Sequence, residues 1–308
     1  MTTVTLARNA MATRFEVVLN GENAVALRAA GEEALTEIEK LEDRLSLFRP
    51  HSEIAHVNAR AAREAVRVTP EVFGLLDRAR QLHVETEGAF DITIAPLMRA
   101  WGFQQGSGKP PPPEMVEAAR AVTGMRLVHL DPAEFSVRFE KPGVMIDLGA
   151  IGKGYAVEMA AEILREAGVE SALLHGGTST LYAIGHPPDR ETWEIAIETP
   201  PALRETHVPL GRIPLRDTAL SVSAVWGKFF EWGGRMVGHV IDPRTGQPAG
   251  SAVLAAVQCT SATDTGALST ALLVRGAEGL EPIGRLRPGL RDWVAEWNQD
   301  EVVLRAWP

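Results

Sequence analysis

The sequence predicts an α+β fold, in which strands and helices are mixed. Short segments with apolar residues at every second position indicate strands, and longer segments with apolar residues three or four positions apart indicate helices. These segments do not follow the regular strand–helix–strand rhythm of a doubly wound parallel sheet. The 308 residues are 45% hydrophobic and 23% charged, which is typical of a globular chain with one large domain or two modest ones.

Clear patterns define the elements of the first part of the chain. Thr13 to Leu19 alternates like a strand, and Ala24 to Leu47 has helical spacing. A second helix is predicted from Pro70 to Glu85, with Thr69 as its N-cap and proline at its first position. Between the two helices, residues 48–61 contain proline, serine and asparagine, so we interpret them as a turn.

The rest of the chain contains more strands than helices. Residues 106–113, GSGKPPPP, are predicted to be a surface loop. Strands are predicted at 137–147 and 171–184, and short strands and turns fill the region 193–257. A helix follows at 264–275. The chain ends in a predicted hairpin, in which DWVAEW and VVLRAW flank the turn NQDE.

Composition and charge exclude several classes of protein. The net charge of -9 and the pI near 5.5 argue against nucleic-acid binding, which needs a basic surface. No run of 18 apolar residues is present, so no membrane span is expected. The first residues lack a basic segment followed by an apolar one, which predicts a cytoplasmic protein without an export signal. The single cysteine excludes an internal disulfide.

The segment IDLGAIGKGYA, from Ile146 to Ala156, has the sequence of an anion-binding turn. A strand, a glycine-rich turn and a helix start present main-chain N–H groups to a phosphate, and Lys153 adds positive charge. The segment is not a P-loop, because Gly154 stands where serine or threonine is required. Its glycines also lack the spacing of a dinucleotide fingerprint. A glycine-rich junction needed only for tight packing remains an alternative.

Three further segments contain residues that can carry chemistry. GAFDITIAPLMRAWGF (88–103) contains Asp91, HVIDPRTGQP (239–248) contains His239 and Asp242, and SATDTGALSTALLV (261–274) contains Asp264. Each has a structural explanation when taken alone. A single histidine is more often structural than catalytic, Asp242 suits a turn, and Asp264 suits a helix N-cap.

Taken together and in this order, these segments resemble the ApbE-like family of FAD:protein FMN transferases. The resemblance runs from Met11 to about Gly276 and also includes MATRFEV, LSLFRPHSEIAHVN and LLHGGTSTLYAIG. It implies a single T-fold-like α+β domain over residues 1–308, with largely antiparallel sheets packed with helices. This domain can divide into two subdomains with the FAD cleft between them. Such enzymes cleave the pyrophosphate of FAD, attach FMN to a threonine or serine of a target flavoprotein, and release AMP.

The resemblance also implies roles for individual residues. Phe48 is expected to stack on the nucleotide, and His239 is the candidate general base for the acceptor hydroxyl. The carboxylates of Asp91 and Asp147 are expected to accept hydrogen bonds from the ribose or adenine groups of FAD. Placed next to the pyrophosphate, their negative charges would repel it. The implied FAD contacts are Met11, Phe48, Ala89, Phe90, Asp91, Asp147, Lys153 and Val240.

The implied Mg²⁺ site is where this sequence departs from the family. The resemblance places a main-chain carbonyl at Ala150, a carboxylate on the last helix and a threonine hydroxyl four residues later, at Thr270. Gly266 stands at the carboxylate position, and Thr178 stands after the glycine pair, where the family commonly has an acid. Asp264 reaches the site only if residues 261–265 are still a loop.

Mg²⁺ binding is therefore expected to be weak, because magnesium favours anionic oxygens. Two alternatives to FMN transfer stay open. The first is a non-catalytic FAD-binding homologue that acts as a carrier or regulator. The second is an FAD pyrophosphatase that gives FMN and AMP with water as the acceptor. If the helix register is as argued, Gly266→Asp should tighten Mg²⁺ binding.

Overall fold

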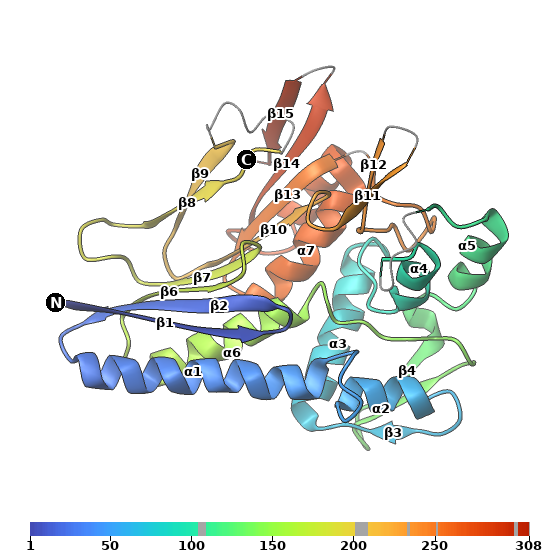
Figure 1. Ribbon diagram of the computed structural model, residues 1–308, viewed down its shortest axis with the longest axis horizontal. Helices are drawn as coiled ribbons and strands as arrows, with labels where there is room; N and C mark the ends of the chain where they lie inside the picture. Colours follow the sequence, from blue (N-terminus) through green and yellow to red (C-terminus); the bar gives the residue numbers. More distant parts are fainter. Residues whose placement is uncertain (104–108, 201–208, 233–234, 251, 299–300, 308) are drawn as a thin grey trace.

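An eight-stranded antiparallel sheet forms the centre of the protein (Figure 1). The computed structural model describes residues 1–103, 109–200, 209–232, 235–250, 252–298 and 301–307. The strands lie in the order β1-β2-β6-β7-β10-β13-β14-β15, and every neighbouring pair is antiparallel. Their bounds are β1 Thr2–Ala10, β2 Thr13–Gly21, β6 Ser171–Gly176, β7 Thr180–Ile184, β10 Ala219–Ala224, β13 Ala252–Cys259, β14 Arg291–Asn298 and β15 Glu301–Ala306. The predicted α+β class with largely antiparallel strands is confirmed.

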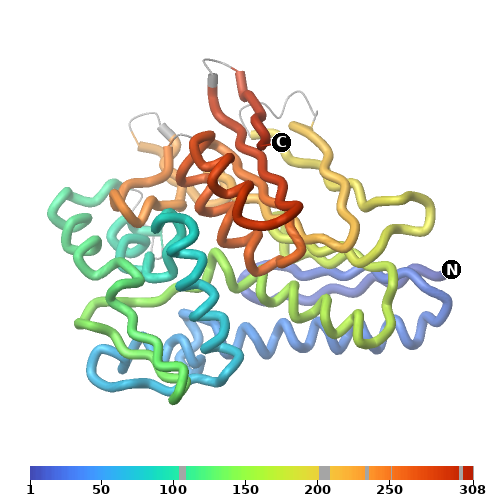
Figure 2. Tube along the Cα trace, turned by 180° about the vertical axis from the view of Figure 1, so that it is seen from behind, coloured from blue at the N-terminus to red at the C-terminus, as the bar shows by residue number. Residues whose placement is uncertain are grey.

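Helices cover one face of this sheet and a strand pair covers the other. Because successive strand residues point to opposite faces, Val257 of β13 packs toward the helices and Ala256 packs toward the strand pair. The helices α1 and α6 lie side by side beneath the sheet, and α6 also packs against α7 (Figure 2). The bounds are α1 Ala24–Leu45, α6 Gly152–Glu166, α7 Ala262–Arg275, β8 Trp193–Ile197 and β9 Gly211–Leu215.

The remaining elements gather beside one end of the central sheet (Figure 1). They are α2 Glu53–Arg60, α3 Pro70–Glu85, α4 Ala95–Ala100, α5 Pro113–Arg120, the small sheet of β3 Val66–Arg67, β5 Ser136–Phe139 and β4 Val128–Asp131, and the hairpin of β11 Phe229–Trp232 and β12 Arg235–Gly238. Short helical turns occur at η1 Met125–Leu127, η3 Gly276–Gly279 and α8 Leu280–Gly284. No helix in the described part of the chain has the length and apolar character that a membrane crossing requires.

Several predicted elements are confirmed. Strand β2 contains the predicted strand 13–19, helix α3 has the predicted bounds, and α1 and α7 match their predicted helices within two residues. The terminal hairpin is present as β14 and β15, although residues 299–300 of its turn lie outside the described residues. Thr69 precedes α3 as predicted, but its hydroxyl bonds Glu53 and makes no cap hydrogen bond.

Three predictions need correction. Residues 53–60 form helix α2, because the Ser52 hydroxyl caps it by accepting from Ala55 N at 2.9 Å. The predicted strand 137–147 ends at Phe139, so the segment before the glycine-rich turn is not a regular strand. Helix α5 begins at Pro113, the last residue of the predicted loop 106–113. Residues 106–108 of that loop lie outside the described residues.

The buried carboxylate of Asp292 leads to a prediction about stability. Neither of its oxygens has a hydrogen-bond partner among the described residues. Burial raises the pKa of Asp292 to about 7. The folded chain keeps this proton at pH values well above 3.8, which is the pKa of the same group in the unfolded chain. We therefore expect the free energy of unfolding to fall by about 1 kcal/mol per pH unit between about pH 5 and 7.

Urea unfolding at these two pH values measures the slope. Asp292→Asn should reduce the slope, because the amide has no proton to lose in this range. A wild-type slope in the variant would show that another group is responsible.

Candidate functional site

Helix α2 and the loop that contains Ile92 hold the glycine-rich turn between Ile146 and Lys153. The Asn58 side chain donates through Nδ2 to the Ile146 carbonyl at 2.8 Å and accepts from the Ile146 N–H at 2.7 Å. The main-chain N–H of Asp147 donates to the Ile92 carbonyl at 2.7 Å. An asparagine amide offers a donor and an acceptor, as a peptide group does, so Asn58 takes the place of a neighbouring strand.

The turn ends at the start of helix α6. The Asp147 carboxylate accepts a hydrogen bond from the Gly149 N–H at 2.8 Å, which closes the turn. Helix α6 begins at Gly152 without a side-chain cap. A Cβ at Gly154 would lie 2.1 Å from the Ala262 carbonyl, so this glycine lets α6 approach α7. Tight packing between helices therefore explains the glycine at position 154. The uncapped start of α6 is in addition suited to binding an anion.

Lys153 shares its surroundings with a second lysine. Burial lowers the pKa of Lys153, the charge of Lys228 lowers it further, and the carboxylate of Asp147 opposes both effects. The positive charge of Lys228 disfavours the charged form of Lys153, and a bound anion would offset this effect. The lysine pair is therefore suited to a phosphate or diphosphate. Sequence reasoning found Lys153 but missed Lys228, which lies before a hairpin and in no recognisable motif.

His239 has the tautomer and the protonation state of a base. Its main-chain N–H and its Nδ1 both contact the Lys228 carbonyl, at 3.0 and 3.1 Å. A carbonyl only accepts hydrogen bonds, so Nδ1 carries the proton and Nε2 has a free lone pair. Burial lowers the pKa of His239, and the charges of Lys228 and Lys153 lower it further, although the carbonyl contact opposes this. The neighbouring Val240 packs against the main core.

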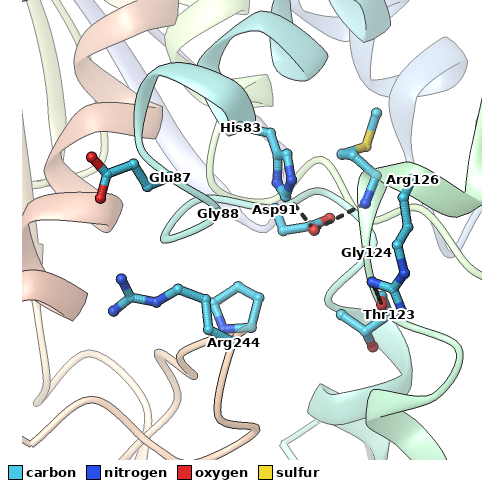
Figure 3. Close-up of a pocket in the computed structure, with 10 residues that line it drawn as sticks. His83, Glu87, Gly88, Asp91, Thr123, Gly124, Arg126 and Arg244 are labelled. Atoms are coloured by element: carbon cyan, nitrogen blue, oxygen red, sulfur yellow. Dashed lines mark hydrogen bonds and ion pairs between the residues drawn. The ribbon is translucent and has the colours of Figure 1, made fainter.

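The segment Ala89–Asp91 is buried, and its carboxylate is already bonded. Asp91 Oδ1 accepts from the N–H and the hydroxyl of Thr93, at 2.7 and 2.6 Å. Its Oδ2 accepts from the Met125 N–H at 3.2 Å and lies 3.2 Å from His83 Nδ1 (Figure 3). Burial alone would lower the pKa of His83, but the contact with Asp91 raises it. This geometry gives the Asp91 side chain a structural role.

A cavity of about 260 Å³ lies beside Asp91. Glu87, Arg126 and Arg244 also line it (Figure 3). Arg244 forms a two-point ion pair with Asp242, with both N–O distances at 2.9 Å. Ligand sites typically enclose about 300–1,000 Å³, so this cavity has room for only part of a dinucleotide.

Met11 and Phe48 lie on segments that border a second cavity. Met11 occupies the turn between β1 and β2 with a positive φ of 49°, and it packs against the core. A cavity of about 460 Å³ is lined by residues next to both, including Ala10, Ala12 and Arg49. The Phe48 side chain is 76% exposed, which leaves its ring free for stacking on a planar ligand.

Asp264 is held away from the candidate metal position. Helix α7 begins at Ala262, so Asp264 is already helical and points away from the site in the predicted register. The nitrogens Nε and Nη2 of Arg78 donate to its two oxygens at 2.8 and 2.7 Å. Arg287 Nε donates at 3.0 Å, and both arginines also pair with Glu85. All of these contacts assign the Asp264 carboxylate to a buried ion-pair network.

The other candidate metal ligands lie close together but offer no charge. A Cβ at Gly266 would lie 2.8 Å from the Ala150 carbonyl oxygen, so position 266 faces Ala150 as the register argument required. The Thr270 hydroxyl, one turn further along α7, donates to the Gly266 carbonyl at 3.1 Å. Within the described residues, no group of three or more histidine, cysteine, aspartate or glutamate side chains could hold a metal. These donors do not fit a resident Mg²⁺ ion, which favours anionic oxygens.

Known proteins are similar to this chain in both sequence and overall fold. A sequence profile of the ApbE family matches residues 11–291. The chain is 31% identical over 246 residues to the FAD:protein FMN transferase of Vibrio cholerae, which covers 78% of this chain and 72% of that protein. The solved ApbE protein of Thermotoga maritima superposes with a TM-score of 0.88 at 25% identity, over 99% of this chain and 96% of that one. The apo flavinyl transferase ApbE of Pseudomonas stutzeri superposes with a TM-score of 0.85 at 28% identity, over 99% and 94%.

Proposed function

This chain belongs to the ApbE family, and on that premise we propose that it is an FAD:protein FMN transferase. FAD is the donor, and a threonine or serine hydroxyl of a target flavoprotein is the acceptor. The observation that best supports the proposal is the contact of His239 Nδ1 with the Lys228 carbonyl, which leaves Nε2 as the basic nitrogen, beside the positive charges of Lys228 and Lys153. A diphosphate and a nucleophilic hydroxyl are the two groups that such a site suits.

The reaction follows from these side chains. The lysine pair binds the diphosphate and offsets the negative charge that grows on the leaving phosphate. Nε2 of His239 takes the proton of the acceptor hydroxyl as its oxygen attacks the phosphorus of the FMN half. The new phosphoester bond joins FMN to the acceptor, the bond between the two phosphates breaks, and AMP leaves.

We further propose that FAD lies across the two cavities and the turn between them. Met11 and Phe48 border one end, and Ala89, Phe90 and Asp91 border the other. Asp147 and Val240 flank the central lysine and histidine. In this proposal residues 1–308 act as one domain, whose FAD cleft lies between the central sheet and the part formed by α2 to α5. We also propose a cytoplasmic location, which fractionation of cells that produce the protein would test.

An incubation with FAD, Mg²⁺ and a candidate acceptor domain tests the function. Flavin that stays on the acceptor after denaturation supports FMN transfer. FMN and AMP without an adduct would indicate hydrolysis of FAD, and bound but intact FAD would indicate a carrier. Either of these last two results contradicts the proposed transfer.

Mg²⁺ is part of the proposal only as a weakly held ion. Ala150 and Thr270 would contact it through neutral oxygens, so the protein supplies no anionic ligand there. Gly266→Asp adds the carboxylate, and we expect at least about 10-fold tighter Mg²⁺ binding by titration calorimetry. Because the new Cβ meets the Ala150 carbonyl at 2.8 Å, we also expect the free energy of unfolding to fall by about 1–3 kcal/mol.

Gly266→Asn is the matched control. It has nearly the same volume and the same close contact, so it should lose the same stability without a comparable gain in Mg²⁺ affinity. Equal Mg²⁺ affinity in both variants and the wild type would show that position 266 does not face a metal site.

A further inference from the structure

We propose that Phe103 is a positioning residue, which holds the imidazole ring of His239 in the orientation that a general base needs. This inference rests on the proposed function, because His239 acts as a base only in the transfer of FMN. Phe103 follows helix α4 and lines neither of the two cavities described above. Its effect on the reaction is therefore expected through His239 and not through contact with FAD.

The end of helix α4 fixes the position of Phe103. The N–H of Phe103 donates to the Met98 carbonyl, and the N–H of Gly102 donates to the Arg99 carbonyl, both at 3.0 Å. Gly102 has a φ of 75°, in the left-handed region that favours glycine. These features make a Schellman motif, which is a common way for a helix to end at a glycine. Local hydrogen bonds therefore set the direction of the chain at Phe103.

A second contact fixes the end of α4 against the chain that follows His239. The indole Nε1 of Trp101 donates to the Gly246 carbonyl at 2.8 Å, and this hydrogen bond is buried. Ile241, two residues after His239, packs in the same apolar cluster as Trp101. Because Trp101 and Phe103 are only two residues apart, the end of α4 contacts the segment 239–246 at two points.

The Phe103 ring contacts the rings of both His239 and Phe230. Its centroid lies 6.4 Å from that of His239, and the two planes are inclined at 71°, which is an edge-to-face arrangement. Its centroid lies 5.4 Å from that of Phe230 on strand β11. Phe230 packs against the same apolar cluster as Phe103. The Phe103 ring is therefore supported by the hairpin while it contacts the proposed base.

Two contacts together determine how the imidazole lies. Nδ1 of His239 contacts the Lys228 carbonyl at 3.1 Å, which fixes one atom of the ring. The ring can still tilt about that hydrogen bond. The edge-to-face contact with Phe103 favours one tilt and so sets the direction in which Nε2 points. A base must lie within hydrogen-bond reach of the hydroxyl whose proton it removes, so this direction affects the rate.

The Phe103 ring also contributes to the burial of the imidazole. Burial is the largest cause that lowers the pKa of His239. The charges of Lys228, before the hairpin, and of Lys153, on α6, lower this pKa further, and the contact with the Lys228 carbonyl raises it. An alanine at position 103 would admit water to the imidazole, so the pKa of His239 should rise toward its ordinary value of 6.5. A role confined to stability would leave this pKa unchanged.

The variant Phe103→Ala tests the proposal. We expect kcat for FMN transfer to fall about 10-fold to 100-fold, with the KM for FAD unchanged. The acid limb of the kcat profile should move to higher pH. NMR titration of the free protein should show the same rise in the pKa of His239, whose signal is identified by its absence in His239→Gln. Phe103→Tyr keeps the ring and should recover most of the lost rate.

Two further variants separate positioning from a general loss of structure. Phe135 makes a similar edge-to-face contact with Phe73, with ring centroids 5.5 Å apart and planes inclined at 74°. Phe135→Ala removes that contact and should leave kcat and the pKa of His239 unchanged. Phe103→Leu keeps most of the apolar volume, which protects folding, but it has no ring and should also lower kcat. Thermal unfolding checks that each variant is folded.

The outcomes distinguish this inference from the proposed function. If the wild type transfers FMN and folded Phe103→Ala keeps both its kcat and the pKa of His239, the positioning role is overturned and the function stands. If Phe103→Ala does not fold, an unchanged kcat in Phe103→Leu overturns it. Equal losses of kcat in Phe103→Ala and Phe135→Ala overturn it as well. If the wild type transfers no FMN to a domain with threonine at its acceptor site, both proposals are overturned.

Discussion

The variant His239→Gln is expected to lose FMN transfer by about 100-fold to 10,000-fold while it still binds FAD. Glutamine keeps a donor for the Lys228 carbonyl but has no basic nitrogen in place of Nε2. The loss should appear in kcat, because the proton moves only in the chemical step. Single-turnover kinetics and FAD binding, measured on the same protein, separate the two effects.

The pH dependence of transfer adds an independent check. Burial and the two lysines lower the pKa of His239 from 6.5, so the base is unprotonated at neutral pH and is lost only on acidification below that value. The acid limb of the kcat profile should therefore lie below pH 6.5. His129→Gln, at an exposed histidine paired with Glu140, should leave the rate unchanged. If the His239→Gln variant transferred FMN at a rate within a few-fold of the wild type, His239 would not be the general base.

The second large effect is expected at Asp264. Asp264→Ala leaves Arg78 and Arg287 facing each other without their shared carboxylate. Removing one partner of a buried ion pair costs about 3–5 kcal/mol, and we expect about 3 here, because both arginines keep contacts with Glu85 and some exposure. Urea unfolding measures this loss. The Mg²⁺ dependence of transfer should not change.

A surface pair gives the comparison for this loss. Asp77→Ala removes the contact with Arg80, three residues along the same helix, and should cost less than about 1 kcal/mol. If Asp264→Ala kept full stability but required far more Mg²⁺ for transfer, Asp264 would be a metal ligand after all.

The long elements of the fold could be predicted because their patterns are regular and local. The helix at 70–85 carries its proline start and its apolar spacing in the sequence. Helix α2 was missed because it has only eight residues and follows a proline, although Ile54 and Val57 at helical spacing were a usable signal. The extended segment that ends at Asp147 was taken for a strand, because the sequence does not show that its hydrogen bonds go to Asn58.

The candidate site could be predicted only in part, because its residues come from distant segments. Lys153 and His239 were found through the motifs around them. Lys228 was missed because only the folding of the hairpin places its carbonyl against His239. The direction in which the Asp264 side chain points depended on where α7 begins. Because α7 begins at Ala262, Asp264 is part of the helix. The contacts of Asp264 with Arg78 and Arg287 could not be predicted, because they join three separate segments of the chain.

The central claim is that the turn before α6, with Lys153 and Lys228, holds the diphosphate of FAD. Equilibrium dialysis of the purified protein against FAD and against riboflavin, each with and without Mg²⁺, tests it most directly. The account predicts uptake of about one FAD per chain, already without added Mg²⁺, and much weaker uptake of riboflavin, which lacks phosphate. No uptake of FAD under either condition, or equal uptake of both compounds, would contradict it.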